Sequence, residues 1–446
     1  MHETSQPKAR GLMQSLFSLC AVSYLLIYAF EGAIRYGLYN IGHDDAILLR
    51  DGLVLLPLAA LFTTQAFRLR VHPAFFVFAG VIGLHGLIAV LNLGTAVPAI
   101  YGTKLMVNVL FGFLAARPLA QPSRRVLWLL ALVWLVSVTG VVLDKFVYTF
   151  PWMGLETHIG GIQVDVSRGW DIDSGFDKRA AGFARSSIAA AMLLPTLALI
   201  IAPRIRSVVV RFLLLGVTVG AVVLTTQKGA LVAVAAVSAI LCAPAWGRYR
   251  LLCLACLGFA VVDVALPLIT AGLLIPESGG VFSLQSFAMR IVSTWPEAWQ
   301  WIVHNQVFPF GVGLGGIGGA QRFYAPNFFN PSDNLFVFLY ANFGVLGLVY
   351  LAWTSCIGLR LPAHLQPRAT AALALLAFNL GYGAALSMLE DQVSAMFFGA
   401  AAGLLWQLHQ IARAGAWTDP FERARARFRA MQPPYAPVGT QIARVR

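Results

Sequence analysis

Twelve apolar stretches of membrane-spanning length divide this chain and leave few folds open to it. About 20 apolar residues in a helix cross the roughly 30 Å hydrocarbon core of a bilayer, and a helix satisfies its own backbone hydrogen bonds there. The composition agrees, since 59% of the 446 residues are hydrophobic and 11% are charged. We therefore predict an all-α polytopic membrane protein with about twelve transmembrane helices. The stretches lie near residues 12–31, 47–66, 73–93, 97–116, 125–145, 184–203, 208–226, 229–246, 250–274, 334–358, 368–388 and 391–412.

The lysines and arginines between these stretches predict which side of the membrane each loop faces. Positive residues gather in the short loops on the cytoplasmic side. With the N-terminus in the cytoplasm, most of the 32 lysines and arginines fall in the inner loops and the C-terminal tail, whereas most of the 19 acidic residues do not. The net charge of +13 thus indicates a membrane protein with two cytoplasmic termini and not a partner of nucleic acid.

Six regions follow from this arrangement. Two outer loops are long, and long loops without secondary structure of their own are usually functional. The second is rich in aromatic residues, and its stretch Phe282–Val303 has the pattern of an amphipathic helix at the headgroup level. The regions are a five-helix membrane region (1–145), an outer loop (146–183), a four-helix membrane region (184–274), a large outer loop (275–333), a three-helix membrane region (334–412) and a basic cytoplasmic tail (413–446).

Four polar segments face the outer side in this topology. The first, Asp177–Arg185, enters the sixth helix, and the second, Thr225–Ala230, forms the turn between the seventh and eighth. The third is Arg290–Trp295, followed by Pro309–Gly315, and the fourth, Ser332–Gly347, opens the tenth helix. Charged residues at membrane depth are costly and usually functional, so we expect these segments to form one site.

The charges in these segments suit an anionic substrate. An arginine binds two phosphate oxygens with its planar fork and stays charged when partly buried. Cations gathered near the outer interface therefore predict a site for a lipid-linked phosphate or pyrophosphate. The candidates for catalysis are Asp333, Arg290 and Arg179, and those for binding pyrophosphate or glycan are Arg185, Lys228, Lys104, Arg322, Asn334 and Trp295.

Structural roles compete with these functional ones. Asp333 precedes a helix, where aspartate commonly serves as the N-cap, and Arg185 and Lys228 can reach lipid headgroups by snorkelling. The run Gly311–Gly319 includes a GxGxxG pattern outside any strand-and-helix unit, so we expect a flexible turn that lets the backbone approach a sugar or phosphate. The eight histidines show no metal-ligand spacing, and we expect no metal.

Taken in order, the four segments resemble the bacterial O-antigen ligase and Wzy-type O-antigen polymerase superfamily. The resemblance covers roughly residues 175–350, while the first five helices match only in hydropathy. The third and fourth segments are its specific part. The matching residues are Arg179-Ala-Ala-Gly182, Thr225-Thr-Gln-Lys-Gly-Ala230, Arg290-Ile-Val-Ser-Thr-Trp295 with Pro309-Phe-Gly-Val-Gly-Leu-Gly315, and Asp333-Asn-Leu-Phe-Val with Gly344-Val-Leu-Gly347.

The resemblance implies a membrane glycosyltransferase of the metal-independent C-type group, without a cofactor, in the bacterial inner membrane with its site facing the periplasm. A glycan on undecaprenyl pyrophosphate would be attacked at its anomeric carbon by a hydroxyl of an acceptor, with inversion expected. The acceptor is a second glycan or the lipid A core. A chain-length regulator protein is a further partner that a polymerase of this family would have.

Two departures from the family pattern bear on the reaction. Lys228 stands where the family usually has arginine, and Asp333 stands where ligases carry a histidine. The second departure favours a polymerase of O-antigen, capsule or exopolysaccharide repeats, with a ligase as the alternative. A transporter or lipid-linked oligosaccharide flippase is the alternative from another class, but the two internal repeats of many transporters are not visible.

Overall fold

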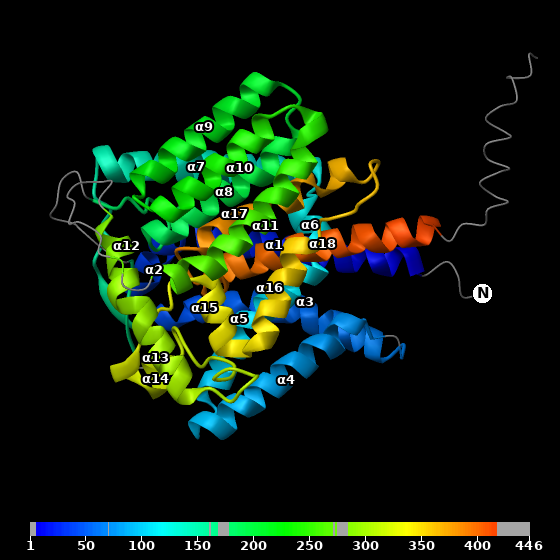
Figure 1. Ribbon diagram of the computed structural model, residues 1–446. Helices are drawn as coiled ribbons and strands as arrows, with labels where there is room; N and C mark the ends of the chain where they lie inside the picture. The colour runs from blue at the N-terminus through cyan, green and yellow to red at the C-terminus, as the bar shows by residue number, and fades with distance from the viewer. Residues whose placement is uncertain are drawn as a thin grey trace, which may run out of the picture.

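Long helices make up nearly all of the structure (Figure 1). The computed structural model describes residues 6–69, 71–159, 162–167, 178–270, 273 and 284–416. Within these residues, seven helices are long and apolar enough to cross a membrane, and three shorter apolar helices accompany them. The chain therefore has the fold of an all-α, multi-pass membrane protein.

A helix stands at each of the twelve predicted positions, although not all twelve meet the length and hydropathy expected of a span. Seven candidate spans and three shorter apolar helices, one of which is α16, account for ten of these helices. Helices α17 and α18 are long enough to span a membrane but are less apolar. The helices are α1 (Gln6–Ala29), α3 (Leu49–Ala66), α4 (Pro73–Leu93), α5 (Val97–Leu114), α7 (Arg124–Phe146), α8 (Ser187–Ile201), α9 (Val208–Leu224), α10 (Lys228–Cys242), α11 (Ala245–Ile269), α15 (Leu335–Phe343), α16 (Val345–Cys356), α17 (Gln366–Gly383) and α18 (Gln392–Ala416).

The predicted tenth helix, residues 334–358, is in fact two. Gly344 separates α15 from α16 with a φ of 57° and a ψ of −137°, a conformation that glycine adopts at no steric cost. A Cβ at this position would lie 2.0 Å from the carbonyl oxygen of Pro309. Hydropathy does not report such a break, because the apolar pattern runs on through the glycine.

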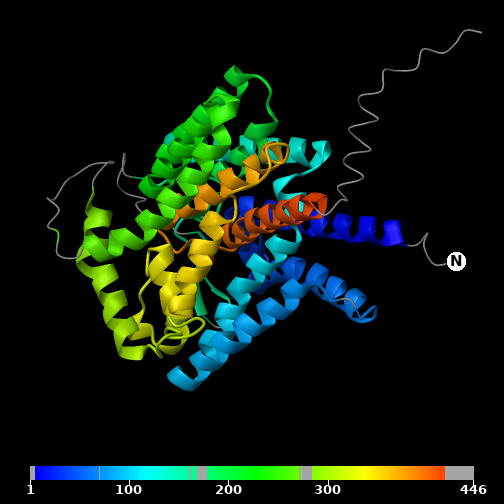
Figure 2. The same cartoon turned by 45° about the vertical axis from the view of Figure 1, so that its right-hand side comes forward.

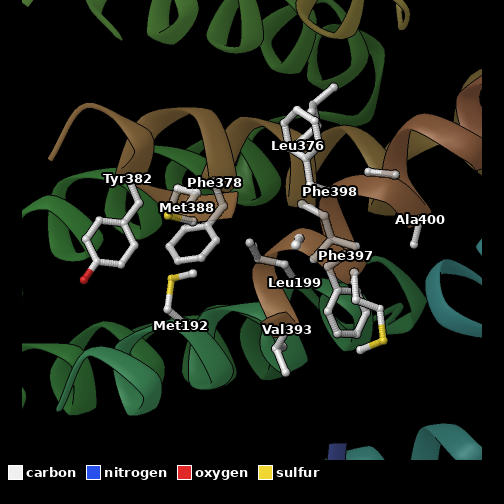
Figure 3. Packing of buried hydrophobic residues seen from close by; sticks show 14 of the residues in the cluster. Met192, Leu199, Leu376, Phe378, Tyr382, Met388, Val393, Phe397, Phe398 and Ala400 are labelled. Atoms are coloured by element: carbon white, nitrogen blue, oxygen red, sulfur yellow. The ribbon is translucent and has the colours of Figure 1, made fainter. Parts of the chain in front are cut away.

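The core of the bundle is built around α8, whose apolar window is 83% buried. A buried helix that is apolar on all sides is surrounded by protein, and α7, α9, α17 and α18 all pack against α8. Figure 3 shows side chains of α8, α17, η6 and α18 packed together in this core. The labelled residues are Met192, Leu199, Leu376, Phe378, Tyr382, Met388, Val393, Phe397, Phe398 and Ala400.

The periphery is apolar but exposed. The α4 window has the high mean hydropathy of 2.4, yet only 11% of it is buried. Helix α9 likewise exposes Val209, Phe212 and Leu213. Apolar surface of this extent requires an apolar surrounding, which for these helices is lipid.

The two ends of the bundle differ. Both the start of α1 and the end of α18 lie at one end, on the right in Figure 1. The opposite end, which we call the polar end, carries most of the short helices, and Figure 2 shows α12 and α13 as an arm there. The short elements are α2 (Glu31–Asn40), η1 (Asp44–Leu48), α6 (Ala116–Ala120), η3 (Ala202–Arg204), α12 (Gln285–Met289), η4 (Arg290–Thr294), α13 (Trp295–Asn305), α14 (Gln321–Tyr324), η5 (Pro326–Phe328) and η6 (Met388–Glu390).

The two long loops of the prediction contain secondary structure. The amphipathic helix expected at Phe282–Val303 is present as the continuous run α12, η4 and α13, while residues 282 and 283 lie outside the described part of the chain. The first loop holds an antiparallel hairpin of β1 (Glu156–Ile159) and β2 (Ile162–Asp165), which was not predicted. Thr157 of the hairpin donates a hydrogen bond to Asp44 of η1, which holds it against the bundle.

Glycines allow α18 to lie directly on α5. A Cβ on Gly399 would stand 2.1 Å from the carbonyl oxygen of Val109, and one on Gly403 would stand 2.3 Å from that of Phe113. Small residues at such contacts let helix backbones approach closely in a membrane. Because α18 also leads from the polar end, this contact fixes where its first residues lie.

We predict that Gly399→Ala destabilises the protein by about 1–3 kcal/mol, since α5 and α18 must move apart to admit a methyl group. The midpoint of thermal unfolding in detergent measures the change. Gly220→Ala on α9 is the matched control, because nothing lies within 4 Å of its added Cβ. Equal midpoints for the two variants would contradict the packing described here.

Candidate functional site

An ion pair joins the third and fourth polar segments at the polar end. The Nε of Arg290 lies 3.1 Å from the Oδ2 of Asp333, and the two side chains are 20% and 21% exposed. The Nε–H makes no hydrogen bond of good geometry, so the contact is ionic. An arginine held in this way can exchange the carboxylate for another anion without losing a directed hydrogen bond.

Arg290 stands at the start of η4, a single π-helical turn between α12 and α13. Such turns are rare and often mark functional sites, because they rotate the following side chains relative to an ordinary helix. The guanidinium also donates from Nη1 to the carbonyl oxygen of Ser286, one turn earlier, at 3.1 Å. The helix itself therefore limits the positions that the Arg290 side chain can take.

Asp333 is not the N-cap of α15, because Asn334 has that role. The Asn334 side chain accepts a hydrogen bond from the backbone N–H of Val337 at 3.0 Å. Asp333 has a φ of 42°, in the left-handed region that aspartate and asparagine tolerate best among non-glycine residues. The capping role considered for Asp333 is thus excluded, and its carboxylate points to Arg290 instead.

Asn334 itself does not meet the expectation that it binds substrate. Its side chain is buried, and its Nδ2 donates to the carbonyl oxygens of Asp263 at 3.1 Å and Ala384 at 3.4 Å. With the oxygen engaged in the cap, the amide is fully used inside the protein. Asn334 therefore sets the start of α15 and leaves its neighbour Asp333 at the surface of the site.

The loop before Asp333 is fastened from two sides. Asn330 donates from Nδ2 to the carbonyl oxygen of Thr294, the last residue of η4, at 2.8 Å. Ser387 donates to the carbonyl oxygen of Pro331 at 2.8 Å and is hydrogen-bonded to Ser332. These bonds tie η4 and the loop together, so that Arg290 and Asp333 are positioned by separate backbone anchors and not only by each other.

The turn that carries Lys228 reaches this pair through Tyr382. The Tyr382 hydroxyl donates to Gln227 Oε1 at 3.2 Å, and Lys228 is the first residue of α10. Arg290 and Asp333 lie within electrostatic range of the same hydroxyl. Figure 3 shows this hydroxyl pointing out of the hydrophobic cluster. The second, third and fourth segments thus meet around Tyr382, which sequence reasoning did not identify.

Arg179 belongs to a segment that is fixed on α7 by a buried carboxylate. Asp144 accepts from the backbone N–H groups of Ala181 at 2.7 Å and Gly182 at 2.9 Å, and it pairs with Lys178 at 2.9 Å. The backbone N–H of Ala180 donates to the carbonyl oxygen of Leu224, at the end of α9. The half-buried Arg179 therefore lies near the turn that leads to Lys228. Asp144 was overlooked because hydropathy assigned it to a membrane helix.

A second group of charges occupies the other side of the polar end, and we call it the Glu31 cluster: Glu31, Arg35, Arg50, Asp51 and Lys104. Glu31 pairs with Arg35 at 2.7 Å and with Arg50 at 2.6 Å, and Asp51 pairs with Lys104 at 2.8 Å. Burial tends to raise the pKa of Glu31, but the positive charges of Arg50, Arg35 and Arg185 outweigh it and lower the pKa to about 2. The carboxylate is therefore ionised.

The structure places Lys104 and Arg185 beside other charges than the Arg290–Asp333 pair. Lys104 is bonded to Asp51, and Arg185 lies close enough to act on the charges of Glu31 and Arg35. Both belong with the Glu31 cluster. No motif pointed to this group, although Glu31 and Arg35 are spaced four residues apart, as partners on one helix face are.

Two further candidates have other surroundings than expected. Trp295 is 1% exposed and packs edge-on against Phe287, with ring centroids 6.0 Å apart, so it is a core residue and does not present a face to a sugar. Arg322 is exposed, and its guanidinium lies 4.2 Å from the centroid of the Phe329 ring. A cation over an aromatic face is a stabilising contact in itself.

The glycine run is not the flexible, substrate-facing turn that we expected. Gly311 to Gly318 are buried, and four of these glycines have a positive φ. A Cβ on Gly315 would lie 2.0 Å from the carbonyl oxygen of Pro98, and one on Gly313 would lie 2.5 Å from the backbone nitrogen of Ala89. The close approach that glycine permits here is to α4 and α5.

We predict that Glu31→Gln destabilises the protein by about 3–5 kcal/mol, because it leaves two buried arginines without their carboxylate. The pKa of Glu31 is below its ordinary 4.5, so the ion pairs stabilise the fold fully above that pH and lose this effect as the pH falls toward 2. Unfolding midpoints measured from neutral pH downward test both statements. The exposed Glu297→Gln is the control and should change little.

Among the residues that the structure describes, no three His, Cys, Asp or Glu side chains gather as metal ligands. No protein-family model matches the chain, and no curated protein is significantly similar to it.

Proposed function

We propose that this protein is a membrane glycosyltransferase that polymerises undecaprenyl-pyrophosphate-linked oligosaccharide repeats at the periplasmic face of the bacterial inner membrane. In this proposal all twelve helices span the membrane, and the polar end faces the periplasm. The basic loops at the opposite end support this orientation. The products are O-antigen, capsule or exopolysaccharide chains.

The contact between Arg290 and Asp333 is the observation that carries the proposal. A cation that suits phosphate and a carboxylate able to accept a proton stand 3.1 Å apart, partly exposed, at the polar end of the bundle. Glycosyl transfer from a lipid pyrophosphate needs both groups, one beside the leaving group and one beside the acceptor hydroxyl. Both residues come from the segments on which the family resemblance is most specific.

The reaction proceeds as a single displacement. The acceptor hydroxyl oxygen forms a bond to the anomeric carbon while the bond from that carbon to the pyrophosphate oxygen breaks, and its electron pair remains on the pyrophosphate. Asp333 takes the hydroxyl proton. Protonation removes the charge that held Arg290, whose guanidinium then stabilises the growing charge on the leaving pyrophosphate. Arg179 and Lys228 add positive charge from the neighbouring segments.

The two candidate enzymes, a polymerase and a ligase, differ in the acceptor that they use. A polymerase transfers the glycan to another lipid-linked repeat, whereas a ligase transfers it to the lipid A core. Asp333, in the position where ligases carry histidine, favours the polymerase.

We predict that Arg290→Ala abolishes transfer by purified protein while its amount in the membrane stays normal, because the side chain contributes no buried hydrogen bond that the fold requires. Arg290→Lys should also lose most activity, since lysine lacks the fork that binds two oxygens. Arg125→Ala, an exposed arginine at the other end of the bundle, is the matched control. Transfer by Arg290→Ala at a near-normal rate would refute the role.

We predict that Asp333→Asn lowers the transfer rate by roughly 10²–10⁴-fold, because asparagine cannot accept the proton. Stability should be unaffected, since Asn334 holds the cap and asparagine tolerates the positive φ of this position.

The pH dependence of the transfer rate distinguishes an Asp333 that acts as the base from one that only positions Arg290. If Asp333 is the base, the rate of the wild-type protein falls on the acid side and the residual rate of Asp333→Asn does not. A variant that keeps the acid-side fall, or that works at the wild-type rate, would show that Asp333 is not the base.

A further inference from the structure

We infer that the Glu31 cluster together with Arg185 is a second anion-binding site, which takes the pyrophosphate of a second lipid-linked glycan while the first is held at Arg290. The inference rests on the proposed function, because only a polymerase uses two substrates of this kind. The acceptor glycan would then bind at this second site at the polar end, and the donor at Arg290.

Positive charge exceeds negative charge in this group. Arg35, Arg50, Lys104 and the nearby Arg185 bring four cations, whereas Glu31 and Asp51 are the only carboxylates paired with them among the described residues. The nearby Asp391 carboxyl is already engaged by Tyr28 at 2.5 Å and by Ser394. A purely structural network of buried charges would be expected to balance, because an uncompensated buried ion is costly. A bound anion beside the buried arginines would offset part of this excess.

Several donors in the group have no acceptor. The Nη1 of Arg35 and the Nε atoms of Arg50 and Arg185 are buried and make no hydrogen bond among the described residues. Buried donors are normally satisfied, so three in one group of arginines call for an acceptor with several oxygens. Phosphate oxygens meet that requirement, and arginine forks match their geometry.

Lys104 provides the approach to this site. Its side chain is 43% exposed and that of Asp51 is 25% exposed, whereas Arg35 and Arg50 are about 90% buried behind them. An anion can therefore meet Lys104 first and the arginines afterwards. Arg50 also donates a hydrogen bond to the Oε1 of Gln392, the first residue of α18, at 2.5 Å.

The second site is separate from the Arg290 site but adjoins it. Asp391 lies within electrostatic range of Tyr382, beside Arg290 and Asp333, and also within range of Glu31. Asp391, the residue before α18, thus lies near both groups.

Binding of undecaprenyl pyrophosphate without a glycan tests the inference independently of catalysis. The protein is placed in nanodiscs of neutral lipid, and the number of bound molecules is counted by native mass spectrometry. We expect two in the wild type, one in Arg290→Ala, and one in the double variant Lys104→Gln/Arg185→Gln, which spares the Glu31 ion pairs. Affinity at the altered site should fall at least tenfold, and the exposed Arg125→Gln at the other end should bind two.

The other possible results distinguish a failure of the second site from a failure of the proposed function. One molecule in the wild type, lost only in Arg290→Ala, overturns the second site and leaves the proposed function standing. None in the wild type overturns both. Two molecules in the double variant, or none, refute a separate site formed by these residues. Displacement of one molecule by phosphatidylglycerol would show an ordinary headgroup site instead.

Discussion

The pairing of buried charge governs the polar end of this protein. A carboxylate such as Glu31 is tolerated away from water only because Arg35 and Arg50 contact it directly. That requirement draws together elements far apart in sequence, since Arg50, near the start of α3, also contacts Gln392 of α18. Asp144 does the same for the segment that carries Arg179. The bundle thus ends in a surface where each charged side chain is placed by several helices.

The Arg290–Asp333 pair differs from these in being more open. Its side chains are about one fifth exposed, and its contact lacks a directed hydrogen bond, whereas Glu31 is bound by two arginines in the interior. The backbone on each side is nevertheless anchored, at Asn330 and at the Asn334 cap. Fixed backbones with an exchangeable ionic contact are what a site needs if its arginine is to pass from a carboxylate to a phosphate during reaction.

Hydropathy located the helices because the length and composition of an apolar stretch are local properties of the sequence. It did not predict the break at Gly344, the hairpin beside Asp44 or the burial of the glycine run, since these depend on close contacts with distant residues. The motifs named Arg290 and Asp333, which are in contact. They did not identify Glu31, because a partner 19 residues away, as Arg50 is, leaves no local pattern.

The central claim is that this protein joins lipid-linked repeats to one another, and a reaction with a single substrate tests it most directly. Purified protein in lipid vesicles is supplied with one undecaprenyl-pyrophosphate-linked repeat, without lipid A core and without any other protein, and the products are separated by length. We predict a ladder of longer lipid-linked chains with release of undecaprenyl pyrophosphate. A substrate that remains one repeat long, whether or not it has crossed the membrane, would contradict the account.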